Sequence, residues 1–288
     1  MIGEILKAVV ITIAFLGATM TLNPLSAQEK RIALVIGNDA YQGSAKLNKA
    51  VNDAKLVARS LEESGFEVEL ILDATTRTTL SVLTKTTQQL SPGDLFLMYY
   101  AGHGVQLQGE NFLIPIDAKA GSIQELKETS IGFSKIFQEL GATPPAVSVW
   151  IFDACRDNPF SAPKTRSLRP SRLDGGEQPP MNPQVELTPV KTAGKDLMLG
   201  HLLQASNMPR RRPESLTIFS AGSGSCPSET NPGPVTVFAK ALADQIREGG
   251  EIEGATRVIR RQVVRHTNGQ QVPQIYSDLT SDVKFRGP

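Results

Sequence analysis

Short runs of hydrophobic residues alternate with longer amphipathic segments over most of this chain. The hydrophobic runs contain many β-branched and aromatic residues, which favour strands. They predict strands over 31–37, 65–72, 94–104, 147–152 and 216–224, the last with a turn, and a final strand over 273–279. Hydrophobic residues at helical spacing predict helices over 47–64, 75–90, 133–140, 236–248 and 254–267.

The predicted strands are hydrophobic almost throughout rather than at alternate positions. Such runs are typical of strands that are buried on both faces, and the intervening helices can cover both faces. We therefore expect an α/β fold with a mostly parallel sheet of about six strands and helices on both sides. A chain of 288 residues with 40% hydrophobic content is long enough for one large domain or two small ones.

The first 27 residues have the pattern of an export signal. Lys7 precedes a hydrophobic run from Ala8 to about Ala18, and the segment ends in Ser26 and Ala27. Cleavage after Ala27 is expected. The alternative is an uncleaved membrane anchor, although the run is short for a span of ~20 residues. In either case we expect the remainder to lie outside the cytoplasm, periplasmic or secreted, with a membrane partner only if the segment is retained.

Residues 161–214 differ in composition from the segments around them. They are rich in proline, lysine and arginine and have little periodicity. A long segment of this kind inside a compact domain is usually functional or disordered, so we interpret it as a flexible basic insertion. It separates residues 28–160 from residues 215–288, whose strands and helices are expected to complete the same sheet.

Charge and cysteine content limit the function classes. Lys and Arg total 30 against 29 Asp and Glu, and this balance argues against a bulk nucleic-acid binder. The two cysteines, Cys155 and Cys226, could form a disulfide in an oxidising compartment. A domain of this size would not need a single bridge for its stability. A chemical role for one thiol is therefore the other interpretation.

Two strand ends contain residues typical of nucleophilic catalysis. His103 lies between glycines in "AGHG", and Cys155 lies in "DACRD". Sites in open α/β sheets collect beyond the carboxyl ends of strands. If the two strands are neighbours, the imidazole can take the proton of the thiol, which attacks acyl carbon only as a thiolate. The alternatives are a buried inert thiol and a structural histidine. His201, in the insertion, and His266, at a helix end, are weaker partners for the thiol.

Several motifs in order resemble those of caspase-type cysteine peptidases. In that family the histidine lies about 50 residues before the cysteine, as "YYAGHG" lies before "DACRDNPF". "ALVIGNDAY", "LNKAVNDAKLVARSL", "NFLIPIDA" and "FSAGSG" also match bacterial members similar to metacaspases, paracaspases and orthocaspases. The resemblance covers roughly residues 31–160 and 215–286 and implies a caspase-like three-layer sandwich. It makes 28–160 the large (p20-like) part and 215–288 the small (p10-like) part of one domain.

The resemblance also implies roles for individual residues. Cys155 would be the nucleophile, and His103 the base that activates it and later protonates the leaving amine. The backbone N–H groups of Gly104 and Cys155 would form the oxyanion hole, whose donors must lie near the attacking sulfur. No third carboxylate of a triad is apparent. No cofactor and no metal are expected, because calcium needs several oxygen ligands and only Glu110 and Asp117 are isolated candidates.

Two aspartates predict which side chain the site prefers. The resemblance assigns Asp53, in "VNDAK", and Asp153, two residues before the cysteine, to an acidic pocket, as in metacaspases and paracaspases. Two carboxylates favour a cationic side chain, above all the bidentate guanidinium of arginine. The predicted cleavage is therefore after Arg or Lys. The alternatives are that Asp53 caps or solvates its helix and that Asp153 only pairs with Arg156.

These observations predict an exported caspase-type cysteine endopeptidase whose partners are polypeptides with basic residues at the cleavage site. The basic residues of the insertion, including Arg210, Arg211 and Arg212, make self-cleavage there a hypothesis, with a solvated linker as its alternative. The competing function is a catalytically silent, caspase-like binding or scaffold module. A nucleotide-binding enzyme is disfavoured because "SAGSGS" lacks the lysine of a phosphate-binding loop.

Overall fold

The computed structural model describes residues 29–42, 45–141, 145–154, 214–222 and 232–287. The predicted signal peptide, the insertion up to residue 213, and Cys155, Arg156, His201 and Cys226 lie outside these residues. Within the described ranges, none of the helices has the length and hydrophobicity of a membrane span.

A six-stranded sheet forms the middle of the molecule, with the strand order β2-β1-β3-β7-β8-β9. The strands are β1 (Arg31–Gly37), β2 (Glu67–Leu72), β3 (Leu95–Gly102), β7 (Val147–Ala154), β8 (Glu214–Phe219) and β9 (Gln274–Ser277). The first five strands in this order are parallel, and β9 runs antiparallel to β8 at the edge. The predicted mostly parallel sheet of about six strands is therefore confirmed.

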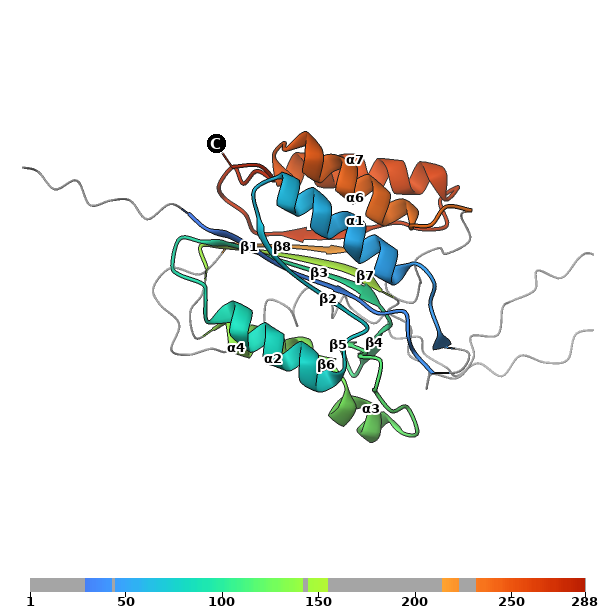
Figure 1. Cartoon of the computed structure of the whole chain (residues 1–288). Coiled ribbons are helices and arrows are strands. Elements are labelled where there is room, and N and C mark those ends of the chain that lie inside the picture. The colour runs from blue at the N-terminus through green and yellow to red at the C-terminus, as the bar shows by residue number, and fades with distance from the viewer. Residues whose placement is uncertain (1–28, 43–44, 142–144, 155–213, 223–231, 288) are drawn as a thin grey trace, which may run out of the picture.

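Helices cover both faces of this sheet and give three layers (Figure 1). On one face lie α1 (Ala50–Glu63), α6 (Val237–Glu248) and α7 (Ile252–His266). On the other face lie α2 (Thr76–Thr87) and α4 (Phe133–Leu140). The C-terminal strands and helices thus complete the sheet that the N-terminal ones begin.

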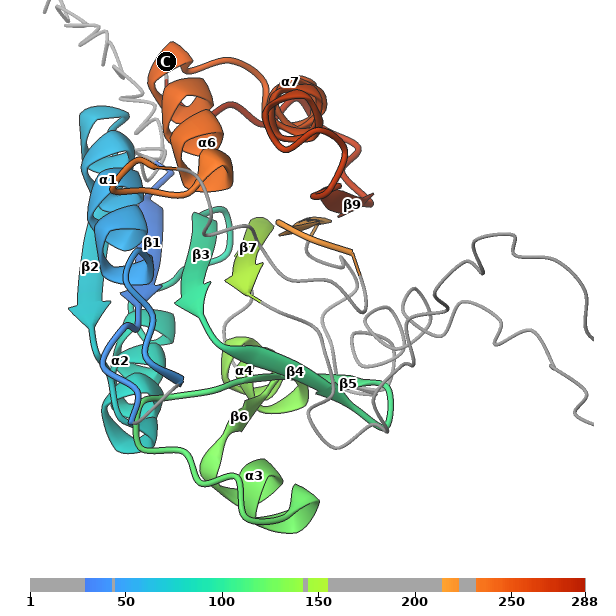
Figure 2. The same cartoon turned by 90° about the vertical axis from the view of Figure 1, so that its right-hand side faces the viewer.

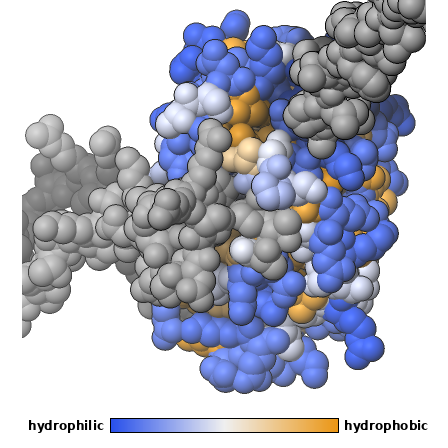
Figure 3. Space-filling view, turned by 90° about the vertical axis from the view of Figure 1, so that its left-hand side faces the viewer, coloured by the Kyte–Doolittle hydropathy of each residue, from blue (hydrophilic) through white to orange (hydrophobic). Residues whose placement is uncertain are grey.

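Alternate side chains of each central strand enter two separate cores. In β7, Val149 and Ile151 pack into the core beneath α1 and α6, whereas Trp150 and Phe152 pack into the core beneath α4. All four side chains are at most 2% exposed. This burial on both faces is the reason that the strand is continuously hydrophobic. Hydrophilic residues dominate the face of the molecule shown in Figure 3, with hydrophobic residues in scattered patches.

A second, three-stranded antiparallel sheet follows β3 (Figure 2). It consists of β4 (Gly104–Leu107), β5 (Glu110–Leu113) and β6 (Ile131–Gly132), and helix α3 (Ile123–Thr129) precedes β6. The hydrophobic pattern does not predict these four elements, because the strands are too short to show a clear alternation. The turn between β4 and β5 uses Gln108 (φ 52°) and Gly109 (φ 87°) in place of the more recognisable Asn-Gly pair.

Gly37 lets α1 approach the end of β1. A Cβ atom at this position would lie 2.5 Å from the Cβ atom of Ala54 and 2.6 Å from the carbonyl oxygen of Ala50. Both separations are shorter than van der Waals contact. A side chain at residue 37 would therefore push α1 away from the sheet.

Gly37→Ala is expected to lower the free energy of unfolding by about 1–3 kcal/mol, the usual range for overpacking. Gly250→Ala is the matched control, because no atom lies within 4 Å of a Cβ atom built there. Urea unfolding followed by far-UV circular dichroism measures both changes. Equal stabilities of the two variants would show that α1 tolerates a side chain at this contact.

Candidate active site

The strands that precede His103 and Cys155 are neighbours in the sheet. β3 pairs with β7 in parallel, and the last pair in the register joins Gly102 to Ala154. His103 follows Gly102 directly, and Cys155 follows Ala154. The strand adjacency on which a shared crevice depends is confirmed. The approach of the thiol to the imidazole stays a prediction, since Cys155 is outside the described residues.

His103 is the single residue between β3 and β4, and a main-chain carbonyl orients its imidazole. The Nε2 atom lies 2.6 Å from the carbonyl oxygen of Ala45. Because a carbonyl oxygen only accepts hydrogen bonds, Nε2 carries the hydrogen in this contact. The neutral ring then has its lone pair on Nδ1, which is the atom that can accept a proton. No residue-type signal marks this partner, because its oxygen belongs to the main chain.

Thr236, the N-cap residue of α6, brings Asp53 and Asp153 together. Its N–H donates to Asp53 Oδ1 at 2.7 Å, and its hydroxyl donates to Asp153 Oδ2 at 3.1 Å. The same hydroxyl accepts the N–H of Ala239 at 3.1 Å, which is the usual contact of a threonine cap. The Tyr99 hydroxyl also lies 3.4 Å from Asp153 Oδ2. The two aspartates that the resemblance singles out therefore share one buried site.

Asp53 does not cap its own helix. The carboxylate of Asp39 accepts the N–H groups of Ala50 and Val51 at the start of α1, at 2.9 and 3.2 Å. Asp53, in the first turn of the same helix, instead accepts the N–H of Thr236. The capping interpretation of Asp53 is wrong.

The acidic site is nearly dry, which changes its protonation. Asp53 and Asp153 are only 1% and 5% exposed. Burial, followed by the negative charge of Asp153, raises the pKa of Asp53 to about 8 from an ordinary value of 3.8, although the hydrogen bonds of Thr236 and the positive charge of Lys49 oppose this rise. Two carboxylates in such surroundings cannot both ionise readily. The pair therefore holds a proton at neutral pH unless a further cation enters.

The motifs do not indicate Thr236 as a residue of this site. Its only sequence signal is the preference for threonine before an amphipathic helix, and the predicted helix over 236–248 includes it as the first residue. That signal predicts a cap, and only the packing of α6 beside α1 and β7 adds the carboxylates.

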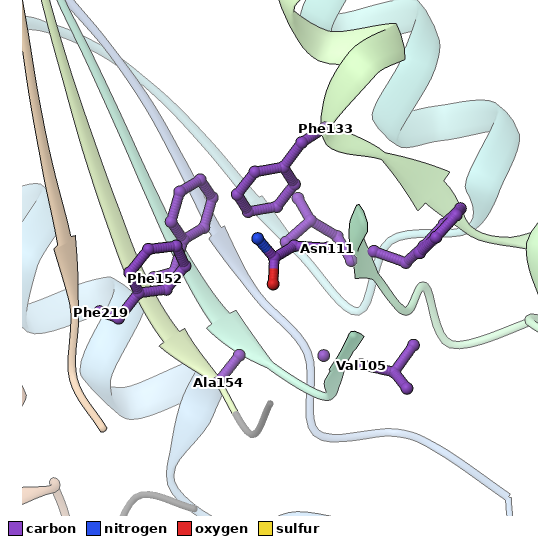
Figure 4. Close-up of a pocket in the computed structure, with 9 residues that line it drawn as sticks. Val105, Asn111, Phe133, Phe152, Ala154 and Phe219 are labelled. Atoms are coloured by element: carbon purple, nitrogen blue, oxygen red, sulfur yellow. The ribbon is translucent and has the colours of Figure 1, made fainter. Parts of the chain in front are cut away.

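An aromatic hollow lies beside the end of β7 (Figure 4). Side chains alternate along a strand, so Phe152 and Ala154 face away from Asp153. The hollow is open to solvent and is lined by Gly104, Val105, Asn111, Phe112, Leu113, Phe133, Phe152, Ala154 and Phe219. The centroids of the Phe133 and Phe152 rings are 4.3 Å apart. The carboxyl end of β7 therefore separates an acidic site on one face from an apolar hollow on the other.

Gly104, a predicted oxyanion-hole residue, begins β4 directly after His103 and lines the aromatic hollow. The absence of a side chain leaves its main chain approachable from that hollow. The second predicted donor, the N–H of Cys155, lies outside the described residues, so the oxyanion hole stays a prediction.

Asp117 and Glu110, the two isolated candidates for calcium ligands, accept hydrogen bonds from residues at the starts of helices. Asp117 accepts the N–H and the hydroxyl of Thr76, at 2.7 and 3.1 Å, at the start of α2. Glu110 accepts hydrogen bonds from the N–H and the hydroxyl of Ser134 in α4. Among the residues that the structure describes, no group of three or more His, Cys, Asp and Glu side chains is arranged to hold a metal ion.

The chain belongs to the caspase domain family, whose model matches residues 30–284. Two curated relatives are mucosa-associated lymphoid tissue lymphoma translocation protein 1 of Homo sapiens and its homolog of Mus musculus. Each is 29% identical over 126 residues, which are 44% of this chain and 15% of the relative. The chain thus matches only a small part of the length of these relatives.

Solved structures show the same fold. Caspase-1 of Spodoptera frugiperda has a TM-score of 0.56 and 17% identity, with 90% of each chain covered. A protein of Geobacter sulfurreducens has a TM-score of 0.54 and 17% identity, with 88% of this chain and 95% of that chain covered. The resemblance to caspase-type peptidases is therefore confirmed. Members of this family are cysteine peptidases that act on polypeptides.

The shared proton predicts a pH dependence of stability. The folded pKa of Asp53, about 8, exceeds its ordinary value of 3.8, so the folded state holds this proton more tightly than the unfolded state. The protonated Asp53 carboxyl group contributes its full stabilisation at a pH below its ordinary pKa. This stabilisation is lost as the pH rises through the pKa of the folded state. Between about pH 5 and pH 8, the free energy of unfolding should fall more steeply in the wild type than in Asp53→Asn. Urea titrations measure both slopes, and equal slopes would contradict the shared proton.

Proposed function

We propose that this chain is a cysteine endopeptidase that cuts peptide bonds after arginine or lysine. The observation that carries this proposal is the buried carboxylate pair, Asp53 and Asp153, at the sheet edge where His103 lies. Asp153 is the second-to-last residue of β7, and His103 follows β3, the neighbouring strand. We expect a peptide that crosses this end of the sheet to place its basic side chain toward the carboxylates and its peptide bond beside the imidazole.

Cys155 and His103 form the proposed catalytic pair. His103 Nδ1 accepts the thiol proton, and the thiolate sulfur attacks the carbonyl carbon of the peptide bond. The resulting imidazolium keeps its Nε2 hydrogen on the carbonyl oxygen of Ala45, 2.6 Å away, and this contact stabilises the positive charge. The N–H groups of Gly104 and Cys155 bind the oxyanion.

His103 then completes the hydrolysis. The leaving amine takes the proton from Nδ1 and departs, and the carboxyl part of the substrate stays on the sulfur of Cys155 as a thioester. Water gives a proton to Nδ1 while its oxygen attacks the thioester. Collapse of this second tetrahedral intermediate releases the carboxylic acid and the sulfur, and Nδ1 returns its proton to the sulfur to restore the thiol. The same nitrogen therefore acts as base, acid, base and acid in turn.

The acidic pair recognises the side chain that precedes the cut. A guanidinium or ammonium group compensates the second negative charge, so binding of the substrate releases the proton that the pair holds. Arginine is favoured over lysine because its planar fork donates to two carboxylates at once. A neutral side chain would leave the pair protonated and gain no ionic contact.

The competing proposal is a caspase-like scaffold without turnover. A fluorogenic Arg-peptide assay, with and without a thiol reductant, separates the two functions. Turnover that needs Cys155 and His103 supports the peptidase. Folded protein that gives no turnover in either condition supports the scaffold.

Asp53→Asn is expected to lower kcat/KM for an Arg-peptide by about 30-fold or more, because it breaks a buried, charge-assisted contact. The value for a peptide with glutamine at the same position should change little. Asp244→Asn removes an exposed carboxylate of α6 that pairs with Lys240 at 2.9 Å, and it is the matched control. Equal losses for the Arg-peptide and the Gln-peptide would contradict an acidic specificity site.

We further propose export by residues 1–27 and self-cleavage within the basic insertion, 161–214. Wild-type protein purified alone is expected to lose the first 27 residues and to accumulate cuts after Lys or Arg in the insertion. Cys155→Ala should lose the leader but keep the insertion intact. Intact mass and N-terminal sequencing locate all of these ends. Equal cutting of the wild type and Cys155→Ala would rule out self-processing. If residues 1–27 remain on the purified protein, the proposed cleavage after Ala27 is wrong.

A further inference from the structure

Two tyrosine hydroxyl groups lie against the main chain of His103. Tyr41 comes from the loop after β1, and Tyr100 comes from β3. Both side chains are buried, and their hydroxyl oxygens are 3.2 Å apart. The proposed reaction does not use either hydroxyl directly.

The hydroxyl pair binds both main-chain groups of the histidine. The N–H of His103 donates to the Tyr41 oxygen at 2.9 Å, and the Tyr100 hydroxyl donates to the His103 carbonyl oxygen at 2.8 Å. The Tyr41 hydroxyl donates to the carbonyl oxygen of Ile114 at 2.8 Å, and the oxygen of Tyr100 lies at the same distance from that carbonyl oxygen. Each hydroxyl has one hydrogen, so this arrangement uses both hydrogens and gives the His103 N–H its acceptor.

The loop after β1 also contacts the imidazole ring. The centroids of the Tyr41 and His103 rings are 4.4 Å apart, with the planes tilted by 56°. Ala45 of the same loop accepts the Nε2 hydrogen. The carboxylate of Asp73, after β2, accepts two N–H groups of this loop at 2.8 Å. One anchored loop therefore contacts the histidine at its main chain, its ring face and its ring nitrogen.

Gly102 leaves the space that the hydroxyl pair occupies. A Cβ atom at this position would lie 2.7 Å from the hydroxyl oxygen of Tyr41 and 2.7 Å from that of Tyr100. Alanine would therefore displace these hydroxyls from His103. This close contact explains why residue 102, directly before His103, is a glycine. The Gly-His-Gly motif alone does not reveal this reason.

Both hydroxyls keep their hydrogens over the pH range in which a peptidase works. Burial is the main cause that raises the pKa of Tyr41 to about 12 and the pKa of Tyr100 well above its usual value. The hydrogen bonds to His103 therefore do not titrate together with a thiol or an imidazole.

We infer that Tyr41 is a positioning residue for His103, which it holds in the ring orientation and tautomer that leave Nδ1 free to accept the thiol proton. This inference rests on the proposed function, because the orientation affects the rate only if His103 moves a proton. A base works efficiently only when its acceptor atom is held within hydrogen-bond reach of that proton. Without the Tyr41 hydroxyl, the His103 N–H loses its acceptor and the contact of Nε2 with Ala45 loosens. The tautomer with its hydrogen on Nδ1, which cannot act as the base at that atom, then becomes populated.

Tyr41→Phe removes the hydroxyl and keeps the ring. With an Arg-peptide, kcat is expected to fall by about 10–100-fold, as for a misplaced catalytic group, while KM stays within about twofold. Gly102→Ala displaces the same hydroxyl and also strains the main chain at φ 157°, so its kcat should fall at least as far. Tyr276→Phe is the matched control: its hydroxyl, in β9, contacts Gln274 at 3.2 Å, and its kcat should equal that of the wild type.

Nitrogen-15 NMR of histidine-labelled protein tests the positioning without any turnover. The chain contains 3 histidines, so His103→Ala identifies the His103 signals by their disappearance. The wild type should show the tautomer with hydrogen on Nε2, and Tyr276→Phe should match it. Tyr41→Phe and Gly102→Ala should show a mixture of tautomers.

A lower kcat together with a changed tautomer in Tyr41→Phe supports the inference. A lower kcat with an unchanged tautomer overturns it, since a merely structural role would give that result, and so does an unchanged kcat. Hydrogen on Nδ1 in the wild type overturns it even if neither variant folds. If the folded wild type does not cut the Arg-peptide, the proposed function fails, and the NMR comparison still decides whether Tyr41 orients the ring.

Discussion

The parallel pairing of β3 with β7 is the constraint on which the candidate site depends. Parallel strands end at the same side of a sheet, and the register that joins Gly102 to Ala154 places the carboxyl ends of both strands next to each other. A slip of one residue would turn Asp153 to the opposite face, because side chains alternate along a strand. The continuous burial of both strands holds the register, since any slip would also misplace the large aromatic side chains of β7.

Because side chains alternate along β7, the two faces of the sheet at its carboxyl end differ in chemistry. Asp153 faces α1 and α6, where Asp53 and Thr236 complete a buried acidic site, whereas Phe152 lines the aromatic hollow on the other face. The acidic site joins distant segments, because Thr236 lies 183 residues after Asp53 in the chain. Burial of two carboxylates opposes folding unless they share a proton or bind a cation. This instability of the empty site is the physical basis of the specificity for basic side chains that we propose.

Main-chain contacts complete the site around His103. The Ala45 carbonyl oxygen and the hydroxyls of Tyr41 and Tyr100 hold the ring and both of its flanking peptide groups. These groups are uncharged at neutral pH, so these contacts orient the histidine without adding a charge beside it. The orientation of His103, the base that we propose, therefore depends largely on the loop after β1.

The hydrophobic pattern by itself determined the α/β class, the strands and helices of the main sheet, and the strand end at which His103 lies. It could do so because burial on one or two faces leaves a local periodic signal. The short strands β4 to β6 and helix α3 leave no such signal. The motifs indicated Asp53 and Asp153, but only the tertiary structure joined them through Thr236 and excluded a capping role for Asp53. Only the tertiary structure also supplied the Ala45 carbonyl and the tyrosine hydroxyls, because contacts to the main chain between distant segments depend on packing and not on residue type.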